Sequence, residues 1–339
     1  SSSATPPVEG LDKTPYLTNR DIFYLDKLPG SMIILGAGPI ATEMAQAFAR
    51  LGTRVTVIQR SGQILSKEDQ DMADIVKQML EEEGVAFQMN DSVVRVGDLG
   101  HETITLKSAA ILVALGRSPN VEGLGLDKID IAYDHKGIKV DDRLRTNHKH
   151  IYASGDVIGG YQFTHVAGYE GGVVLSNAIF HLPKKTNYTY VPWCTYTHPE
   201  LASIGMNEKS AKKAGIEYSV FVEEFSGNDR ALAEGESVGR IKLLLDKKEK
   251  PLGIQILGPG AGDLLSEWVA IMNGGVGLSK IASAIHPYPT LGEINKRVVG
   301  AVFTPKIFSN TVKKGLKFFF SFKGRACTCG QDVACEEEK

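Results

Sequence analysis

The stretch MIILGAGPIA, residues 32–41, decides the fold of this chain. Four apolar residues run directly into glycine, which is typical of a buried parallel strand that turns into a helix. Gly36 permits the tight turn, Gly38 lets a ligand approach the backbone, and Ala41 is small enough for the helix to pack on the strand. The spacing therefore predicts a dinucleotide site, with the pyrophosphate at the helix N-terminus. A turn that only joins the strand to the helix is the alternative.

The segments around this stretch alternate between strands and helices. We expect further strands at 54–58, 85–87, 110–114 and 151–153, and helices at 41–51, 68–83 and 166–179. Such alternation predicts βαβ units and a doubly wound parallel sheet of the α/β class. From residue 187 onward the pattern changes to longer alternating strands, at 239–245 and 253–257, mixed with helices. This change indicates a separate α+β domain.

Composition excludes several classes of function. A chain of 339 residues suits two or three domains. Its formal net charge of −2 gives no electrostatic reason to expect nucleic acid or acidic membranes as partners. No apolar run is long enough for a membrane span. One cysteine lies mid-chain and three lie in the tail, which is no secreted disulfide framework and favours a cytoplasmic location.

The end of the second expected strand bears on the choice of nicotinamide cofactor. An acid at this position binds the ribose 2′-hydroxyl of NAD, whereas an arginine nearby accommodates the 2′-phosphate of NADP. This chain has Gln59 and Arg60 there, and no acid. The planar guanidinium of Arg60 suits a phosphate, so we favour NADPH over NADH. A solvated surface arginine is the alternative.

Five motifs occur in a fixed order along the chain. They are GAGPIA (36–41), ALGRSPN (114–120), TNHKHIYASGD (146–156), YTHPE (196–200) and HPYPTLGE (286–293). Together they resemble the pyridine nucleotide–disulfide oxidoreductases, a group that includes dihydrolipoamide dehydrogenase, glutathione reductase and mercuric reductase. The resemblance implies a homodimer whose C-terminal domain is the interface. It also implies electron flow from nicotinamide through FAD to a disulfide, a metal ion such as mercuric ion, or a related small-molecule acceptor.

The same resemblance divides the chain into five parts. Residues 1–30 would end an FAD domain and connect it onward, 31–118 would bind NAD(P), 119–187 would return to the FAD domain, 188–304 would dimerise, and 305–339 form a tail. Relatives open with their own G-x-G-x-x-G, and the disulfide reductases follow it with a C-x(4)-C redox pair, neither of which is in this sequence. We therefore expect an N-terminally truncated chain that is incomplete and inactive as given. A dimeric nucleotide-binding remnant without turnover is the alternative.

The resemblance also assigns roles to single residues. Glu43 matches a glutamate that in relatives pairs with a lysine beside the flavin, and Gly116 matches a glycine near the nicotinamide cofactor. Asp156 matches the ligand of the ribityl chain of FAD. Phe163 and Thr164 match positions whose backbone amides approach the flavin pyrimidine, where a helix N-terminus would stabilise negative charge on reduced flavin.

The HPYPTLGE motif departs from the pattern of the lipoamide dehydrogenase-like members. They read H-x-H-P-T-x-x-E, with the second histidine as acid–base catalyst and the glutamate as its orienting partner. Here Tyr288 holds the histidine position and Glu293 the glutamate position. A phenol with an ordinary pKa near ~10 cannot replace an imidazole near ~6.5 without large tuning. Tyrosine at this place resembles the mercuric reductase-like branch, where it helps to bind the acceptor metal. Packing at the dimer interface is the alternative.

Cysteines in the tail suggest a second metal-handling element. Cys327 and Cys329 invite comparison with the paired C-terminal cysteines of mercuric reductase, although their C-x-C spacing is a loose match. Soft thiolates suit soft metals. The alternative is a tail with incidental cysteines. The basic segment 313–323 could be an interfacial helix or a solvated end of the protein.

Overall fold

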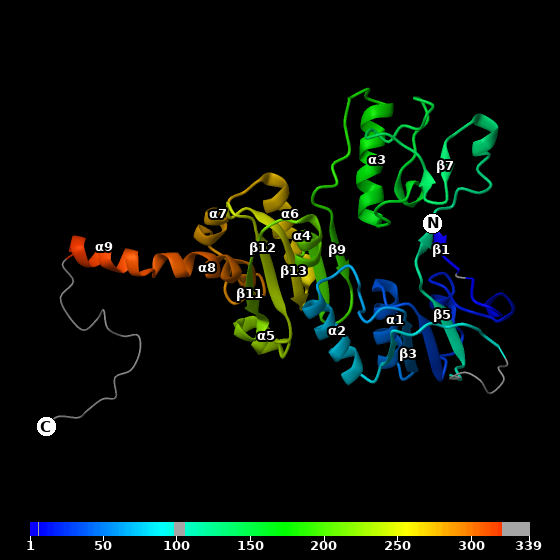
Figure 1. The fold of residues 1–339 in the computed structure, drawn as a ribbon, viewed down its shortest axis with the longest axis horizontal. Coiled ribbons are helices and arrows are strands. Elements are labelled where there is room, and N and C mark those ends of the chain that lie inside the picture. The colour runs from blue at the N-terminus through cyan, green and yellow to red at the C-terminus, as the bar shows by residue number, and fades with distance from the viewer. Residues whose placement is uncertain (6, 98–105, 321–339) are drawn as a thin grey trace.

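The computed structural model describes residues 1–5, 7–97 and 106–320. The chain forms three regions, with a parallel α/β domain and a small segment around α3 at one end and an antiparallel domain beside them (Figure 1). At the opposite end α8 (Glu293–Ile307) packs on the antiparallel sheet, and its last turn and α9 (Asn310–Phe320) form a helical arm that leads away from this domain (Figure 1). No helix among the described residues is both long and apolar enough to cross a bilayer.

The first domain is built on a four-stranded parallel sheet of order β4-β3-β2-β5. Its elements are β2 (Ser31–Leu35), α1 (Pro39–Arg50), β3 (Arg54–Gln59), α2 (Gln70–Glu82), β4 (Ala86–Met89) and β5 (Ala110–Val113). Ile34, Val57 and Leu112 are fully buried in its core. The expected strands and helices of this domain are therefore confirmed, and the fold belongs to the α/β class.

The chain then crosses to a small region that ends in a long helix. Its elements are β6 (Arg117–Ser118), η3 (Leu126–Ile129), β7 (Tyr133–Asp134), β8 (Gly137–Ile138), η4 (Gly155–Ile158) and α3 (Thr164–Ala178). The first residues of the chain, β1 (Ser2–Ser3), pair with β6, and two short 3-10 turns follow, η1 (Leu11–Lys13) and η2 (Ile22–Tyr24).

The expected strand at 151–153 is wrong. Residues there form only an isolated bridge between Arg145 and Tyr152. The backbone of this stretch forms its other hydrogen bonds with the turn just before it. The amide of Thr146 donates to the carbonyl of Ile151 at 2.9 Å, and the amide of Ala153 donates to the carbonyl of Leu144 at 3.1 Å. The apolar residues thus close a local loop instead of extending a sheet.

The second domain is a five-stranded antiparallel sheet of order β11-β12-β13-β10-β9, covered by helices. Its elements are β9 (Pro192–Thr195), β10 (Glu200–Gly205), α4 (Glu208–Ala214), β11 (Ser219–Glu224), η5 (Phe225–Gly227), α5 (Asp229–Glu234), β12 (Arg240–Leu245), β13 (Pro251–Gly258), α6 (Ala261–Gly274), α7 (Leu278–Ser283) and α8 (Glu293–Ile307), followed by α9 (Asn310–Phe320). Trp268 and Phe225 are completely buried in its core. The α+β organisation expected after residue 187 is confirmed.

Candidate functional site

The turn between β2 and α1 has the backbone geometry that its glycines predict. Gly36 has a φ of +98°, and a Cβ there would lie 2.7 Å from the carbonyl oxygen of Ala114. Gly38 is the N-cap of α1, and a Cβ added to it would meet nothing within 4 Å. Ala41 is fully buried against the sheet. The space beside Gly38 therefore opens directly onto the first turn of α1, whose backbone N–H groups have no intrahelical partners.

The end of β3 leaves one cationic side chain free. Gln59 donates to the hydroxyl of Ser61 at 2.8 Å, and Ser61 donates to the carbonyl of Gln63 at 3.0 Å. These two bonds fix the loop. Arg60, between them, is exposed and makes no hydrogen bond or ion pair within the ranges 1–5, 7–97 and 106–320. Its guanidinium is available to an anion bound at the carboxyl edge of the sheet.

Glu43 joins α1 to the second domain. Its carboxylate accepts a hydrogen bond from the backbone amide of Tyr196 at 2.8 Å. Burial raises the pKa of Glu43, and the bond from Tyr196 opposes this only in part. Among the residues that the structure describes, no lysine pairs with this carboxylate. The interaction places Glu43 at the junction between the two domains.

A cleft of about 400 Å³ lies next to this junction, between the start of α3, β9 and α6. Cys194 is half-buried in its wall. Burial, reinforced by the carboxylate of Glu200, raises the pKa of Cys194 to about 12. The thiol is therefore neutral near pH 7 and is a poor nucleophile.

Asp156 lies in the short turn η4, where two other residues hold it. Arg117 donates to its Oδ2 atom at 3.2 Å, and the hydroxyl of Ser1 donates to the same atom. The Oδ1 atom accepts no hydrogen bond from the part of the chain that the structure describes. Asp156 thus keeps one carboxylate oxygen for a hydroxyl donor, and Arg117 orients the other.

Glu170, in α3, holds the turn that carries Asp156. Gly155 has a φ of +75° and donates its amide to Glu170 at 2.5 Å. Tyr188 donates to the second oxygen of Glu170 at 2.7 Å. Glu170 is almost completely buried, so both donors are needed to satisfy its carboxylate. We infer that Glu170 positions Asp156, a role that the sequence patterns did not indicate.

Phe163 and Thr164 form the N-terminus of α3, as the N-cap and the first residue. The ring of Phe163 stacks on His165, with ring centroids 5.2 Å apart and an interplanar angle of 11°. No side chain within residues 1–5, 7–97 and 106–320 caps this helix end. Its first backbone N–H groups are therefore available to an acceptor, as they are at the start of α1.

Tyr288 and Glu293 lie in the loop before α8 and at its first residue. The phenol of Tyr288 donates to Asp229 at 2.8 Å, and this bond raises the pKa of Tyr288. The side chain is 68% exposed. The carboxylate of Glu293 makes no hydrogen bond to any residue that the structure describes. The phenol is therefore a neutral donor near pH 7.

The predicted site residues fall into two groups that one chain does not bring together. Glu43 follows the glycine-rich turn in α1 and bonds to Tyr196, and Asp156, Phe163 and Thr164 lie in η4 and at the start of α3, whereas Tyr288 bonds to Asp229 at the start of α5 in the antiparallel domain. Gly116 has a φ of +127°, and its carbonyl accepts a hydrogen bond from the amide of Ala4 next to the β1–β6 pairing. Cys327 and Cys329 lie outside the described residues.

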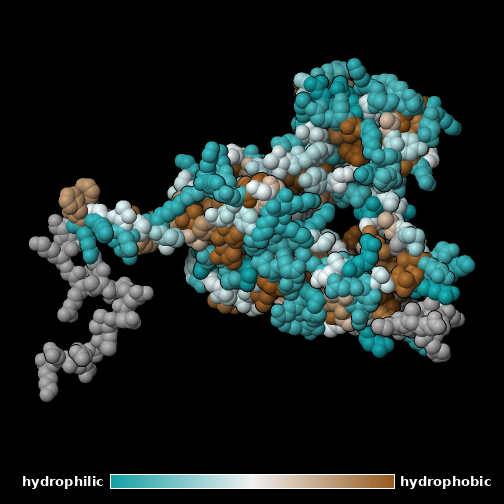
Figure 2. Space-filling view, in the orientation of Figure 1, coloured by the Kyte–Doolittle hydropathy of each residue, from teal (hydrophilic) through white to brown (hydrophobic). Residues whose placement is uncertain are grey.

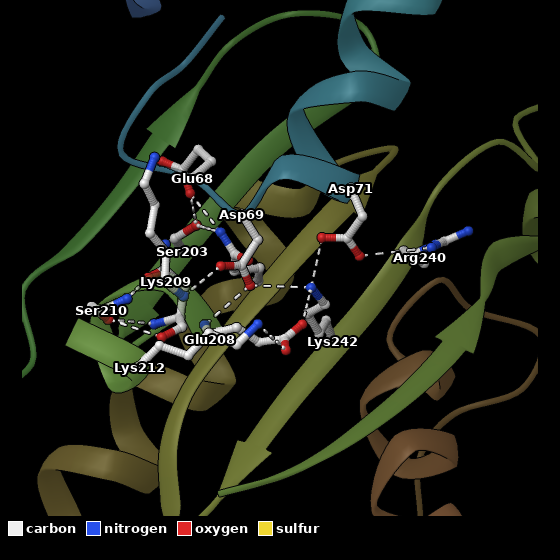
Figure 3. Close-up of polar contacts among 12 residues, drawn as sticks. Glu68, Asp69, Asp71, Ser203, Glu208, Lys209, Ser210, Lys212, Arg240 and Lys242 are labelled. Carbon is white, nitrogen blue, oxygen red and sulfur yellow. Dashed lines mark hydrogen bonds and ion pairs between the residues drawn. The ribbon is translucent and has the colours of Figure 1, made fainter. Parts of the chain in front are cut away.

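A buried polar cluster that the sequence did not predict fastens the two domains to each other (Figure 3). Glu68, just before α2, accepts from Trp193 at 2.5 Å, Ser203 at 2.8 Å and Gln255 at 2.6 Å. Burial raises the pKa of Glu68, and these three bonds oppose the effect. One sequence signal pointed to such a cluster, namely a lysine inside the apolar strand β12.

That lysine, Lys242, is only 2% exposed and is surrounded by three carboxylates (Figure 3). Its ammonium group lies 3.1 Å from Asp69, 2.7 Å from Asp71 and 2.8 Å from Glu208. Asp69 and Asp71 come from the first domain, and Glu208 and Lys242 from the second. The ammonium therefore occupies the centre of a group of oxygens that could otherwise hold a metal ion.

Comparison with known proteins agrees with this geometry. Residues 1–171 match the family described as pyridine nucleotide-disulphide oxidoreductase, and residues 191–299 match its dimerisation domain. The chain is 34% identical to a dihydrolipoyl dehydrogenase of Bacillus subtilis over 86% of its own length and 66% of the relative's. It is also 34% identical to a mercuric reductase of Bacillus cereus, over 86% of its length and 48% of the relative's.

Solved structures show the same likeness. The HOCl-induced flavoprotein disulfide reductase RclA from Escherichia coli superposes with a TM-score of 0.83 at 28% identity, covering 88% of this chain and 71% of that one. The chain spans from about half to about two thirds of the length of the two curated relatives named above. Because the family's sequence pattern and its fold are both present, the chain belongs to the pyridine nucleotide-disulphide oxidoreductase family.

Proposed function

We propose that this protein is an NAD(P)H- and FAD-dependent oxidoreductase that passes electrons from nicotinamide through flavin to a disulfide, a metal ion of the mercuric type or a related acceptor. One observation carries the proposal. The uncrowded space beside Gly38 lies at the uncapped N-terminus of α1, at the carboxyl edge of a parallel sheet. In sheets of this type dinucleotides bind at this edge.

The residues present fit the nicotinamide dinucleotide and the ribityl and pyrimidine side of FAD. The first turn of α1 would bind the nicotinamide dinucleotide through its backbone amides, with Gly38 leaving room for the pyrophosphate. Asp156 would accept from a ribityl hydroxyl through its free Oδ1 atom, while Arg117 holds Oδ2. The start of α3, at Phe163 and Thr164, would face the flavin pyrimidine. FAD, when bound, supplies a carrier that accepts a hydride and releases its electrons to the acceptor.

The chain's own groups orient these ligands. Glu170 holds the Gly155 turn through a bond of 2.5 Å, so the backbone that bears Asp156 is fixed before any ligand arrives. The positive end of the α3 dipole favours negative charge at the flavin pyrimidine. Glu43 is tied to Tyr196, which keeps α1 in place against the second domain.

We assign Tyr288 to the part of the site that binds the electron acceptor in a homodimer. The dimerisation-domain match supports a twofold assembly, and in a form of the protein that carries the redox pair, which the printed sequence lacks, Tyr288 of one subunit would face the pair of the other. Its neutral phenol can donate a hydrogen bond to an acceptor, but it cannot take part in thiol proton transfer near pH 7 as an imidazole does. This chemistry favours metal-ion or quinone-type acceptors over dihydrolipoamide and glutathione disulfide.

The nicotinamide cofactor is NADPH rather than NADH. Arg60 has no partner among the residues that the structure describes and lies just after β3, where a 2′-phosphate would lie, and the sequence has no acid at the position that selects NAD. The bond from Gln59 to Ser61 turns this loop so that Arg60 is left exposed beside the site. An arginine–phosphate contact contributes about 1–3 kcal/mol.

Titration of the full chain with NADPH and with NADH tests both the proposed dinucleotide site and the proposed preference for NADPH. Arg60→Ala should weaken NADPH by about 1–3 kcal/mol and leave NADH unchanged. Arg54→Ala is the matched control, because Arg54 is exposed at the other end of the same strand and should change neither cofactor. Gly38→Val should abolish binding of both by filling the space above the turn, with an unchanged circular dichroism spectrum. If Gly38→Val binds both cofactors normally, the site is not where we place it. If Arg60→Ala weakens both equally, Arg60 is structural and not selective.

A further inference from the structure

The last described helix, α9 (Asn310–Phe320), projects from the body of the protein. It follows α8 after a break at residues 308–309 and leads away from the antiparallel domain (Figure 1). Ser309 caps it, because its hydroxyl accepts from the amide of Val312 at 3.3 Å and its carbonyl from Lys313 at 2.9 Å. The break and the cap define α9 as a separate helix.

One side of α9 is apolar and uncovered. Val312, Leu316 and Phe319 are spaced by four and three residues, so they share one face of the helix. They are 38%, 44% and 79% exposed, and none of α9 is buried. Figure 2 shows apolar residues gathered at the free end of the arm. Ile307 and Phe308 extend this exposed apolar surface to the junction with α8.

The rest of α9 is basic. Lys313, Lys314 and Lys317 are exposed, and residues 310–320 contain no acid. At roughly 100° per residue, Lys313 is the lysine nearest to the apolar face, Lys317 lies further round on the same side and Lys314 lies opposite to the face. Long lysine side chains beside an apolar face can keep their charge in water while their stems cover apolar surface.

We propose that α9 is an interfacial helix that binds the surface of an anionic lipid bilayer, with the face of Val312, Leu316 and Phe319 inserted, Lys313 and Lys317 beside the headgroups and Lys314 on the water side. An apolar face flanked by lysine is the pattern of helices that lie in the plane of a membrane interface. Eleven residues are too few to span a bilayer, so the helix lies on it. The proposal is independent of the redox reaction.

The charge of α9 favours lipid, and not a second copy of the same helix, as the partner that covers its apolar face. If two α9 helices packed through their apolar faces, the lysines beside those faces would converge without any acid on either helix to compensate them. Such like-charge contacts destabilise association. An anionic surface instead attracts each lysine, by roughly fivefold in partitioning per residue.

Co-sedimentation of the full chain with vesicles tests the proposal. Wild-type protein should bind vesicles of phosphatidylcholine and phosphatidylglycerol at least tenfold more strongly than vesicles of phosphatidylcholine alone, and added salt should weaken the binding. The Lys313→Gln, Lys314→Gln, Lys317→Gln triple variant should lose at least tenfold of the binding to the anionic vesicles. Phe319→Ser should lose several-fold.

Phe318 offers a matched control for the apolar face. It is 80% exposed, as Phe319 is, but at roughly 100° per residue it lies about 200° around the helix from Leu316. Phe318→Ser should therefore bind almost as wild-type does. Thermal unfolding of each variant should match wild-type, because the substituted side chains are exposed.

Three results would overturn the proposal. The first is equal binding, or none, to neutral and anionic vesicles. The second is an equal loss for Phe318→Ser and Phe319→Ser, which would remove the oriented face. The third is a lower sedimentation mass for Leu316→Ser than for wild-type without lipid, which would make α9 a contact between copies of this chain.

Discussion

Replacing Lys242 by methionine should be the most destabilising single change at the junction of the two domains. Methionine keeps the unbranched shape but removes the charge, so the carboxylates of Asp69, Asp71 and Glu208 lose their shared cation. Removal of one partner from a buried ion pair costs about 3–5 kcal/mol. Asp69 is 4% exposed and cannot be rehydrated without opening the interface.

The lower end of that range applies here. Asp69 keeps two backbone donors, the amides of Glu208 at 3.2 Å and of Lys209 at 3.0 Å. Asp71 and Glu208 are 44% and 25% exposed at their side chains, so water can replace part of the lost contact. We therefore expect a loss of about 3 kcal/mol in the free energy of unfolding.

The loss should also depend on pH. Burial by itself would raise the pKa of Glu208, but its bond to Lys242 and a second bond from Tyr218 outweigh this and lower it. A carboxyl group whose pKa is lowered on folding contributes stability above its unfolded pKa of about 4.3, and this is lost as the pH falls through the folded pKa. Without Lys242 that contribution is missing, so wild-type and Lys242→Met should converge in acid.

Urea unfolding followed by tryptophan fluorescence measures the effect, because Trp193 donates to Glu68 within the same junction. Arg240→Met is the matched control. Arg240 is on the same strand and pairs with Asp71 and Glu224, but it is 31% exposed, so its removal should cost less than about 1 kcal/mol. An equal cost for the two variants, or a cost below about 1 kcal/mol for Lys242→Met, would refute the argument.

Three further outcomes follow, two from the described contacts and one from the proposed function. Burial raises the pKa of Glu68 on folding. The stability that Glu68 confers relative to Glu68→Gln is therefore fully present below about pH 4.3 and is lost as the pH rises through the folded pKa. Urea midpoints of wild-type that rise with pH relative to those of the variant would contradict this sign. Tyr288→Phe removes an exposed bond to Asp229, so it should change stability by less than about 0.5 kcal/mol. In the flavin-loaded protein the same variant should slow metal-ion reduction without slowing flavin reduction by NADPH, and an unchanged metal-ion rate in stopped-flow experiments would remove Tyr288 from the acceptor site.

Local sequence predicted the parts of the fold whose cause is local. Gly36 has a positive φ because the chain must turn within a few residues from β2 into α1, and the spacing of the glycines carries that information. The alternation of β2, α1 and β3 follows from apolar runs and helix formers that lie next to one another. The first domain was therefore predictable to within a few residues at each element boundary.

Contacts between distant residues could not be predicted in this way. Lys242 and Asp69 are separated by 173 residues, and no pattern in the chain pairs them. A lysine in an apolar strand indicates a buried partner, but not which acid provides it. Similarly, Tyr288 bonds to Asp229, 59 residues earlier, because α5 folds back against the loop before α8. The family motif places Tyr288 next to Glu293 in sequence only.

The cluster around Lys242 also constrains how such proteins can recombine. Asp69 and Asp71 lie in the first domain and Lys242 lies in the second, so in either domain alone these charged groups would lack their partners from the other domain. A chimaera that takes the nicotinamide-binding part from one relative and the antiparallel domain from another keeps this cluster only if both relatives carry the matching charged residues. Grafts that move residues 68–71 together with Ser203, Glu208, Lys242 and Gln255 should yield soluble hybrids, whereas a cut that separates them should not.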